Sequence, residues 1–138
     1  MIPKIIHYCW FGKQPKPEIV LKCIESWKKY CPDWEIIEWN ESNFDVSQHP
    51  YMKEAYEKRK WAFVSDVARL LIIYSRGGVY LDTDVELHAS LNELAIERAF
   101  FVFESDVYIN TGVGFGCEKG HKSVEVMLHY YDNRNFIK

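Results

Sequence analysis

A strand–helix–strand pattern in the first forty residues is the strongest constraint on the fold. Residues 4–10 form a nearly continuous apolar run, which is typical of a parallel strand covered on both faces. Residues 18–30 repeat apolar side chains at helical spacing, and residues 34–39 follow as a second short strand. Such a unit closes with a right-handed crossover and two parallel strands. The chain is therefore expected to be α/β, with a mostly parallel Rossmann-like sheet flanked by helices.

The middle of the chain extends this pattern. Residues 51–60 predict a charged, exposed helix, and residues 61–75 predict a helix that is apolar nearly all round and therefore buried. The pair Gly77-Gly78 then supplies a left-handed helix end and a tight turn before a strand over 79–81. Later segments predict a strand, a glycine-rich loop entering a short strand, and a helix, over 100–104, 108–117 and 123–131.

Composition narrows the functional classes. The 138 residues are enough for one domain, and a net charge of −3 lacks the basic excess of a nucleic-acid binder. No apolar run reaches the roughly 18–20 residues that span a bilayer, and the N-terminus lacks the features of a secretory signal. We therefore expect no transmembrane segment and a cytoplasmic location, with peripheral membrane attachment compatible with it. The four cysteines have no CxxC spacing, so reduced thiols are favoured over a zinc site.

Asp82 and Asp84 are the sharpest functional signal. Ligands of parallel α/β sheets bind outside the carboxyl ends of strands, and these two carboxylates leave a short apolar strand at that place. Their charge would be costly there without a cation, and oxygen ligands of this kind suit Mg²⁺ or Mn²⁺. A solvated turn is the alternative for a DxD sequence alone. The preceding glycine turn and apolar strand favour the metal-binding interpretation.

Asp66 and Arg69 are the only charges in the buried helix. Their i, i+3 spacing places them on one helix face, where they form either a structural ion pair or the polar lining of a cleft. His7, Trp10 and Phe11 end the first strand, at the sheet edge expected for Asp82. Trp10 suits either stacking on a nucleotide base or packing in the core.

Two blocks of the sequence resemble a known family. The stretch IPKIIHYCWFG at residues 2–12 and the stretch AFVSDVARLLIIYSRGGVYLDTD at residues 62–84 are similar to the DXD-containing sugar transferases of the glycosyltransferase 32 type. That group includes yeast mannosyltransferases and capsular polysaccharide enzymes, and the second block recurs in glucosylating toxins. The resemblance covers most of residues 1–120. It implies a GT-A fold and a single domain over 1–138 that corresponds to the N-terminal part of a longer catalytic domain.

The resemblance also implies an activity and residue roles. The chain would be a retaining, metal-dependent hexosyltransferase that moves a sugar from a UDP- or GDP-sugar to a saccharide acceptor, in surface or capsular polysaccharide synthesis. Asp84 would ligate Mn²⁺ or Mg²⁺, with Asp82 assisting and contacting the donor. Asp66 and Arg69 would hydrogen-bond the donor sugar, and Trp10, with His7 nearby, would hold the nucleotide.

Two alternatives stay open at this point. The sequence LDTD at residues 81–84 also matches the opening of haloacid-dehalogenase-type phosphatases, but Glu86 stands where that motif carries Thr or Val. That motif also opens its domain, whereas 81 residues precede Asp82 here. The second alternative is a nucleotide-sugar-binding fragment without turnover, and metal-dependent nucleotide binding together with an activity assay separates the three.

Overall fold

The computed structural model describes residues 1–102, 114–132 and 136. Its helices and strands bear out the α/β pattern, and most lie within a residue or two of their expected positions. In chain order they are β1 (Ile5–Cys9), α1 (Glu18–Tyr30), β2 (Glu35–Trp39), α2 (Pro50–Glu57), α3 (Trp61–Arg76), β3 (Gly78–Tyr80), the 3-10 turn η1 (Leu94–Ile96), β4 (Ala99–Phe101), β5 (Phe115–Cys117) and α4 (Lys122–Asp132).

The strands form one mixed sheet in the order β2-β1-β3-β5-β4. β1 pairs parallel with both β2 and β3, while β5 runs antiparallel to β3 and to β4. Four of these five strands therefore share one direction, which confirms a mostly parallel sheet among the described residues. The expected strand over 100–104 begins one residue earlier, and its last two positions lie outside the described residues, as does Gly112 of the glycine-rich loop.

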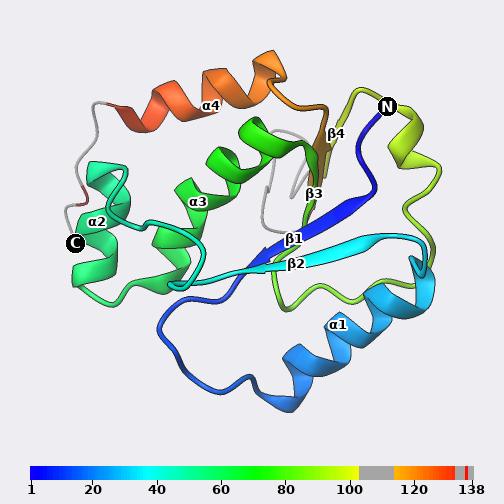
Figure 1. Ribbon diagram of the computed structural model, residues 1–138, viewed down its shortest axis with the longest axis horizontal. Helices are drawn as coiled ribbons and strands as arrows, with labels where there is room; N and C mark the ends of the chain where they lie inside the picture. Colours follow the sequence, from blue (N-terminus) through cyan, green and yellow to red (C-terminus); the bar gives the residue numbers. More distant parts are fainter. Residues whose placement is uncertain (103–113, 133–135, 137–138) are drawn as a thin grey trace.

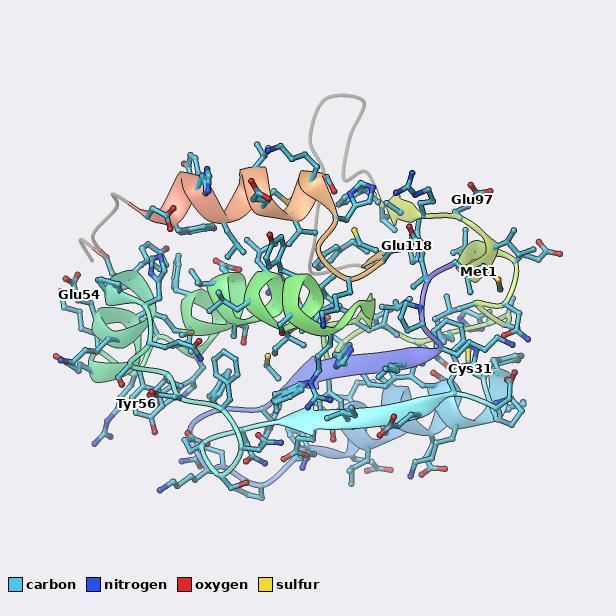
Figure 2. The ribbon with its side chains drawn as sticks, turned by 45° about the horizontal axis from the view of Figure 1, so that its top comes forward. Met1, Cys31, Glu54, Tyr56, Glu97 and Glu118 are labelled. Carbon is cyan, nitrogen blue, oxygen red and sulfur yellow. The ribbon has the colours of Figure 1, made fainter. Side chains whose placement is uncertain are left out.

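Helices cover both faces of the sheet (Figure 1). α1 packs on one face, where its apolar side chains meet those of β1 and β3. α3 covers the other face, with α2 beside it. Figure 2 shows α4, α3, the sheet and α1 following one another from top to bottom. The two β1-facing cores share no side chain, because successive residues of a strand point to opposite faces.

The burial of α3 agrees with its apolar sequence, since six of its aliphatic side chains and Arg69 are buried. The expectation of an exposed helix over 51–60 is wrong for one face of α2. Met52 and Ala55 are completely buried there, packed against the core that α3 forms. α2 is also shorter than expected and ends at Glu57.

The turn from α3 into β3 requires glycine. Gly77 and Gly78 adopt φ angles of 71° and 115°, which L side chains rarely reach. A Cβ atom on Gly78 would also lie 2.8 Å from the carbonyl oxygen of Ile5 in the neighbouring strand. This turn lets β3 enter the sheet directly from the buried helix, so that α3 and the carboxyl end of β3 stay side by side.

Candidate functional site

A cavity of about 510 Å³ opens at the carboxyl edge of the sheet, between the ends of β1 and β3. The crossover from β1 to β2 runs over the α1 face, whereas the connection from β2 to β3 runs over the α3 face. Connections that leave in opposite directions create a crevice at this point of the sheet, where α/β proteins bind ligands. The cavity is lined by residues from the end of β1, the first half of α3 and the end of β3: Cys9, Trp10, Phe11, Gln14, Trp61, Ala62, Ser65, Asp66, Arg69, Tyr80, Asp82, Thr83 and Asp84.

Arg69 holds the charged part of this cavity together. Its side chain is buried, and its Nη2 atom lies 3.3 Å from Oδ1 of Asp66 and 3.4 Å from Oδ1 of Asp82. Its Nε donates to the main-chain oxygen of Ser65 at 3.0 Å. Asp66 and Arg69 were expected to form either a structural ion pair or the polar lining of a cleft. They do both, because the ion pair itself lines the cavity.

Tyr80, at the end of β3, contacts both Arg69 and Asp82. Its side chain is 1% exposed, its ring lies under the guanidinium of Arg69 at 4.9 Å, and its hydroxyl donates to Oδ1 of Asp82 at 2.9 Å. Burial raises the pKa of Asp82, while Arg69 and the Tyr80 hydrogen bond oppose the rise and Asp84 adds to it. Burial also raises the pKa of Asp66, against the attraction of Arg69. The aspartates thus carry charge that one arginine only partly offsets.

Asp84 lies at the exposed rim of the same cavity. The main chain around it is fixed on both sides: the Val85 amide donates to the Asp82 carbonyl, and the Val85 carbonyl accepts a hydrogen bond from the indole of Trp27 in α1 at 2.8 Å. Asp84 is therefore presented to solvent from an anchored turn.

The donor set fits a hard divalent cation. Three carboxylates, those of Asp66, Asp82 and Asp84, face one guanidinium in this cavity, which favours an added positive charge. Within residues 1–102, 114–132 and 136, no group of three or more acidic, histidine or cysteine side chains is arranged to enclose a metal. Asp82 and Asp84 could thus hold Mg²⁺ or Mn²⁺ only together with water or ligand oxygens, as is usual for ions bound with phosphates.

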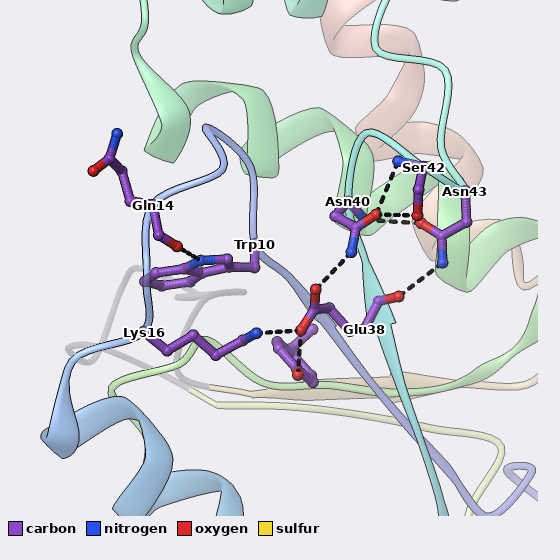
Figure 3. A network of polar contacts seen from close by, with 8 residues as sticks. Trp10, Gln14, Lys16, Glu38, Asn40, Ser42 and Asn43 are labelled. Atoms are coloured by element: carbon purple, nitrogen blue, oxygen red, sulfur yellow. Dashed lines mark hydrogen bonds and ion pairs between the residues drawn. The ribbon is translucent and has the colours of Figure 1, made fainter.

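Trp10, directly after β1, also lines the cavity, and Figure 3 shows the polar contacts around it. Its indole nitrogen donates to the Gln14 carbonyl at 2.7 Å, and the Lys16 ammonium lies 5.9 Å from its ring. Lys16 in turn pairs with Glu38 at 2.6 Å, which also accepts hydrogen bonds from Tyr8 and Asn40. The network gives the indole a fixed place beside a cation.

A second anchor holds the loop that follows Trp10. The Gly12 amide donates to Oε2 of Glu41 at 2.6 Å, and the Tyr56 hydroxyl donates to the same oxygen at 3.0 Å. Burial tends to raise the pKa of Glu41, but these hydrogen bonds outweigh it and leave the pKa below its usual value. Gly12 has a φ of 99°, and a Cβ atom there would lie 2.6 Å from the Trp61 ring. The loop is thus pressed against α3.

His7 is the one predicted site residue that does not line the cavity. It lies in the middle of β1, its side chain is 0% exposed, and burial lowers its pKa to about 4. The Trp39 indole donates to its Nδ1 at 3.0 Å, so Nε2 carries the proton and donates to the Gly77 carbonyl at 2.9 Å. These contacts make His7 a neutral buried link between β2 and the glycine turn, and we no longer expect it to contact a nucleotide.

The structure brings the other five predicted residues together: Trp10, Asp66, Arg69, Asp82 and Asp84. Sequence reasoning missed Trp61, Ser65 and Tyr80. The spacing of Trp61, Ser65 and Arg69 at i, i+4 and i+8 could have found the first two, because it places them on one face of α3 with the predicted arginine. Tyr80 carried no signal beyond its place in an apolar strand.

Comparisons with known proteins agree on the kind of domain. Residues 17–101 match the family described as "Glycosyltransferase sugar-binding region containing DXD motif". Inositol phosphoceramide mannosyltransferase 3 of Schizosaccharomyces pombe is 32% identical over an aligned length of 124 residues, and the match covers 87% of this chain and 34% of that protein. Inositol phosphoceramide mannosyltransferase 1 of the same yeast is 29% identical, over 99% of this chain and 46% of its own length.

A solved structure supports the fold. The PaToxG glycosyltransferase superposes with a TM-score of 0.77 at 19% identity, covering 93% of this chain and 59% of that one. The fold is therefore of the GT-A-like α/β type that the sequence predicted, and the family match favours it over the phosphatase alternative. The chain spans between a third and a half of the length of the two yeast relatives. Since the family match covers more than half of the sequence, the chain belongs to the glycosyltransferase sugar-binding region family that contains the DXD motif.

Proposed function

We propose that this chain binds a nucleotide-diphosphate sugar in the cavity at the sheet edge and transfers the sugar to a saccharide acceptor. The observation that carries the proposal is the cluster of Asp66, Arg69, Asp82 and Asp84 around one cavity of about 510 Å³, which the indole of Trp10 also lines. A cavity of this size suits a ligand with several polar groups and one flat ring.

The residue roles follow from position and charge. Trp10 stacks on the base, since its indole lines the cavity and is held in place by its hydrogen bond to the Gln14 carbonyl. Asp66 and Arg69 hydrogen-bond the hydroxyls of the donor sugar at the inner wall. Asp82 contacts the ribose or the sugar, with its carboxylate oriented by Arg69 and Tyr80. Asp84, which is exposed at the cavity, would hold Mn²⁺ or Mg²⁺ together with oxygen atoms of the nucleotide.

In the reaction, the bond between the anomeric carbon and the diphosphate oxygen breaks, and the electron pair stays with the diphosphate. The acceptor hydroxyl forms the new bond to the anomeric carbon and gives its proton to the departing diphosphate oxygen, so that attack on the same face retains configuration. A bound divalent ion supplies Lewis-acid stabilisation of the leaving group. The carboxylates of Asp66 and Asp82 stabilise the positive charge that develops on the sugar, by electrostatic preorganisation.

The relatives favour mannose as the sugar, because the names of both yeast proteins specify mannosyl transfer. We therefore propose GDP-mannose as the first donor to test, with UDP-hexoses as the comparison. Those names also specify a phosphoinositol-containing acceptor, so a glycolipid headgroup stands beside a capsular or surface polysaccharide as acceptor. No helix in the described part of the chain is long and apolar enough to cross a membrane. A cytoplasmic location stays a prediction.

Calorimetric titration of GDP and UDP, with and without Mn²⁺, tests the proposal. We expect Mn²⁺ to strengthen binding of one nucleotide, and Asp84→Asn to weaken the Mn²⁺-supported binding at least about tenfold. Because Asp84 is exposed, the variant should fold as the parent does. Glu86→Gln is the matched control, since this exposed carboxylate two residues later lies outside the cavity.

Equal binding without metal and in Asp84→Asn would refute the metal role. Metal-dependent binding of the nucleotide sugar with no release of free sugar or transfer product would favour the non-catalytic alternative. Hydrolysis of a simple phosphomonoester that requires Asp82 would instead revive the phosphatase interpretation.

A further inference from the structure

A second hollow lies next to the donor cavity, between α3 and α4. It measures about 370 Å³ and is lined by two residues of α3 and four of α4: Asp66, Leu70, Val126, Met127, Tyr130 and Tyr131. We call it the α3–α4 groove. Val126 and Tyr130 are 59% and 57% exposed, so the groove presents neighbouring apolar side chains to solvent.

The α3–α4 groove and the donor cavity share one residue, Asp66. The carboxylate of Asp66 is 37% exposed and pairs with Arg69 on the cavity side. On the groove side its charge reaches Tyr131: burial raises the pKa of that phenol to about 12, and Asp66 contributes to the rise. A molecule in the groove would therefore lie next to a donor sugar that is bound at Asp66.

The chemistry of the groove selects against a second nucleotide. Among residues 1–102, 114–132 and 136, its one charged lining residue is Asp66, and no lysine or arginine of these ranges lines it. A diphosphate would be repelled there, whereas a neutral ligand with hydroxyl groups could donate to the carboxylate. Two tyrosine rings and a thioether offer apolar contact for the C–H face of such a ligand.

The tyrosine rings are held in place. The Tyr131 ring packs edge-on against Tyr51 of α2 at 5.0 Å and against Tyr130 at 5.3 Å, with interplanar angles of 65° and 87°. Leu70, which forms the floor, is 3% exposed. A preorganised platform loses little side-chain entropy when a ring stacks on it.

We propose that the α3–α4 groove is the acceptor subsite, and that it receives a neutral sugar ring of the acceptor with its apolar face on Tyr130 and its hydroxyls toward Asp66. An aliphatic tail is the less favoured occupant, because the inner end of the groove carries a carboxylate that a tail would have to desolvate. As an acceptor site, the proposal rests on the proposed function, but sugar binding in the groove can be measured without any donor.

Methionine methyl NMR offers a direct readout. The chain has three methionines, and only Met127 lines the groove. Met52 is fully buried and Met1 sits at the far end of the molecule beside Glu118 (Figure 2). With ¹³C-methyl-labelled methionine, titration with methyl α-mannopyranoside should shift the Met127 signal saturably and leave Met1 unmoved.

The variant Tyr130→Ala should weaken this binding at least about fivefold, as expected for the loss of a stacked ring. Because Tyr130 is 57% exposed, the variant should fold as the parent does. Tyr30→Ala in α1 is the matched control on the other side of the sheet. In the same variant, donor hydrolysis with water as acceptor should stay within about twofold of the parent, while transfer to the mannoside falls.

Three results would overturn the acceptor subsite: no saturable Met127 shift, equal weakening by Tyr30→Ala, or a shift with octyl mannoside but none with the methyl glycoside. The last would assign the groove to an apolar tail. Failure of the proposed function looks different, because it would appear as absent Mn²⁺-dependent nucleotide binding while the Met127 titration is unaffected.

Discussion

Removing the hydroxyl of Tyr80 tests whether the donor site depends on an oriented Asp82. Tyr80→Phe keeps the ring beneath Arg69, 4.9 Å from the guanidinium, and deletes the hydroxyl that donates to the Asp82 carboxylate at 2.9 Å and also interacts with the Cys9 thiol. A double-mutant cycle with Asp82→Asn isolates the Asp82 part. Hydrogen bonds to charged groups contribute roughly 1.5–3 kcal/mol to stability. Water can replace part of this bond, because the Asp82 side chain is 37% exposed. We therefore expect a loss of about 1–2 kcal/mol at neutral pH.

The pH dependence of this loss identifies its cause. The Tyr80 hydrogen bond holds the pKa of Asp82 down, against the rise that burial causes. Without it, the pKa of folded Asp82 rises further above the unfolded value, so the variant loses stability as pH increases through that range. At a pH below the unfolded pKa the carboxyl is protonated in both states, and the charged part of the difference disappears. The destabilisation should therefore be larger at pH 7 than at pH 3.5.

Urea unfolding of the parent, Tyr80→Phe, Asp82→Asn and the double variant provides the assay. A coupling energy of about 1 kcal/mol or more at pH 7, falling toward zero at pH 3.5, is the expected result. Tyr74→Phe is the control, because its hydroxyl bonds to Glu125 at the more open surface of α4 at 3.2 Å. A coupling below about 0.3 kcal/mol, or one that is independent of pH, would refute the reasoning.

Two further predictions concern buried contacts near the cavity. Because burial lowers the pKa of His7 to about 4, the unfolded chain takes up a proton that the folded chain refuses, and stability should fall between pH 6.5 and 4 with a slope of up to about 1.4 kcal/mol per pH unit. His7→Gln should flatten that slope in urea titrations, and an unchanged slope would assign the acid sensitivity to other groups. Gly12→Ala should destabilise the chain by about 1–3 kcal/mol, since its φ is 99° and its Cβ would meet the Trp61 ring, and it should weaken nucleotide binding through the Trp10 loop. A variant as stable as the parent by thermal melting would contradict this.

Short stretches of sequence were enough to predict the helix ends and the position of the DxD carboxylates. The bounds of α1 follow from its amphipathic repeat between Pro17 and Pro32, and the place of Asp82 and Asp84 follows from a short strand after two glycines. The sequence of α2 is mostly charged, and this is why an exposed helix was expected. Met52 and Ala55 are buried because α3 packs against them, and the local sequence of α2 does not reveal that contact.

The place of His7 could not be predicted for a related reason. Both faces of β1 are buried, so alternation along the strand gives no sign of which residues reach the ligand edge. Its hydrogen bonds to Trp39 and Gly77 join residues that are 32 and 70 positions away in the chain. The role of Tyr80 could not be predicted for the same reason. It depends on contact with Arg69, a residue of α3 that the turn at Gly77 brings next to the Tyr80 ring.

Of the residues that the structure describes, those that line the cavity all lie between Cys9 and Asp84, in one stretch of the chain. The α3–α4 groove instead takes four of its six residues from α4, which follows β5. Evolution could therefore exchange or reshape the later segment by recombination while the recognition of the donor is inherited intact. If the groove binds acceptors, relatives that share the DxD block could diversify the molecules they modify through changes confined to one exposed helix.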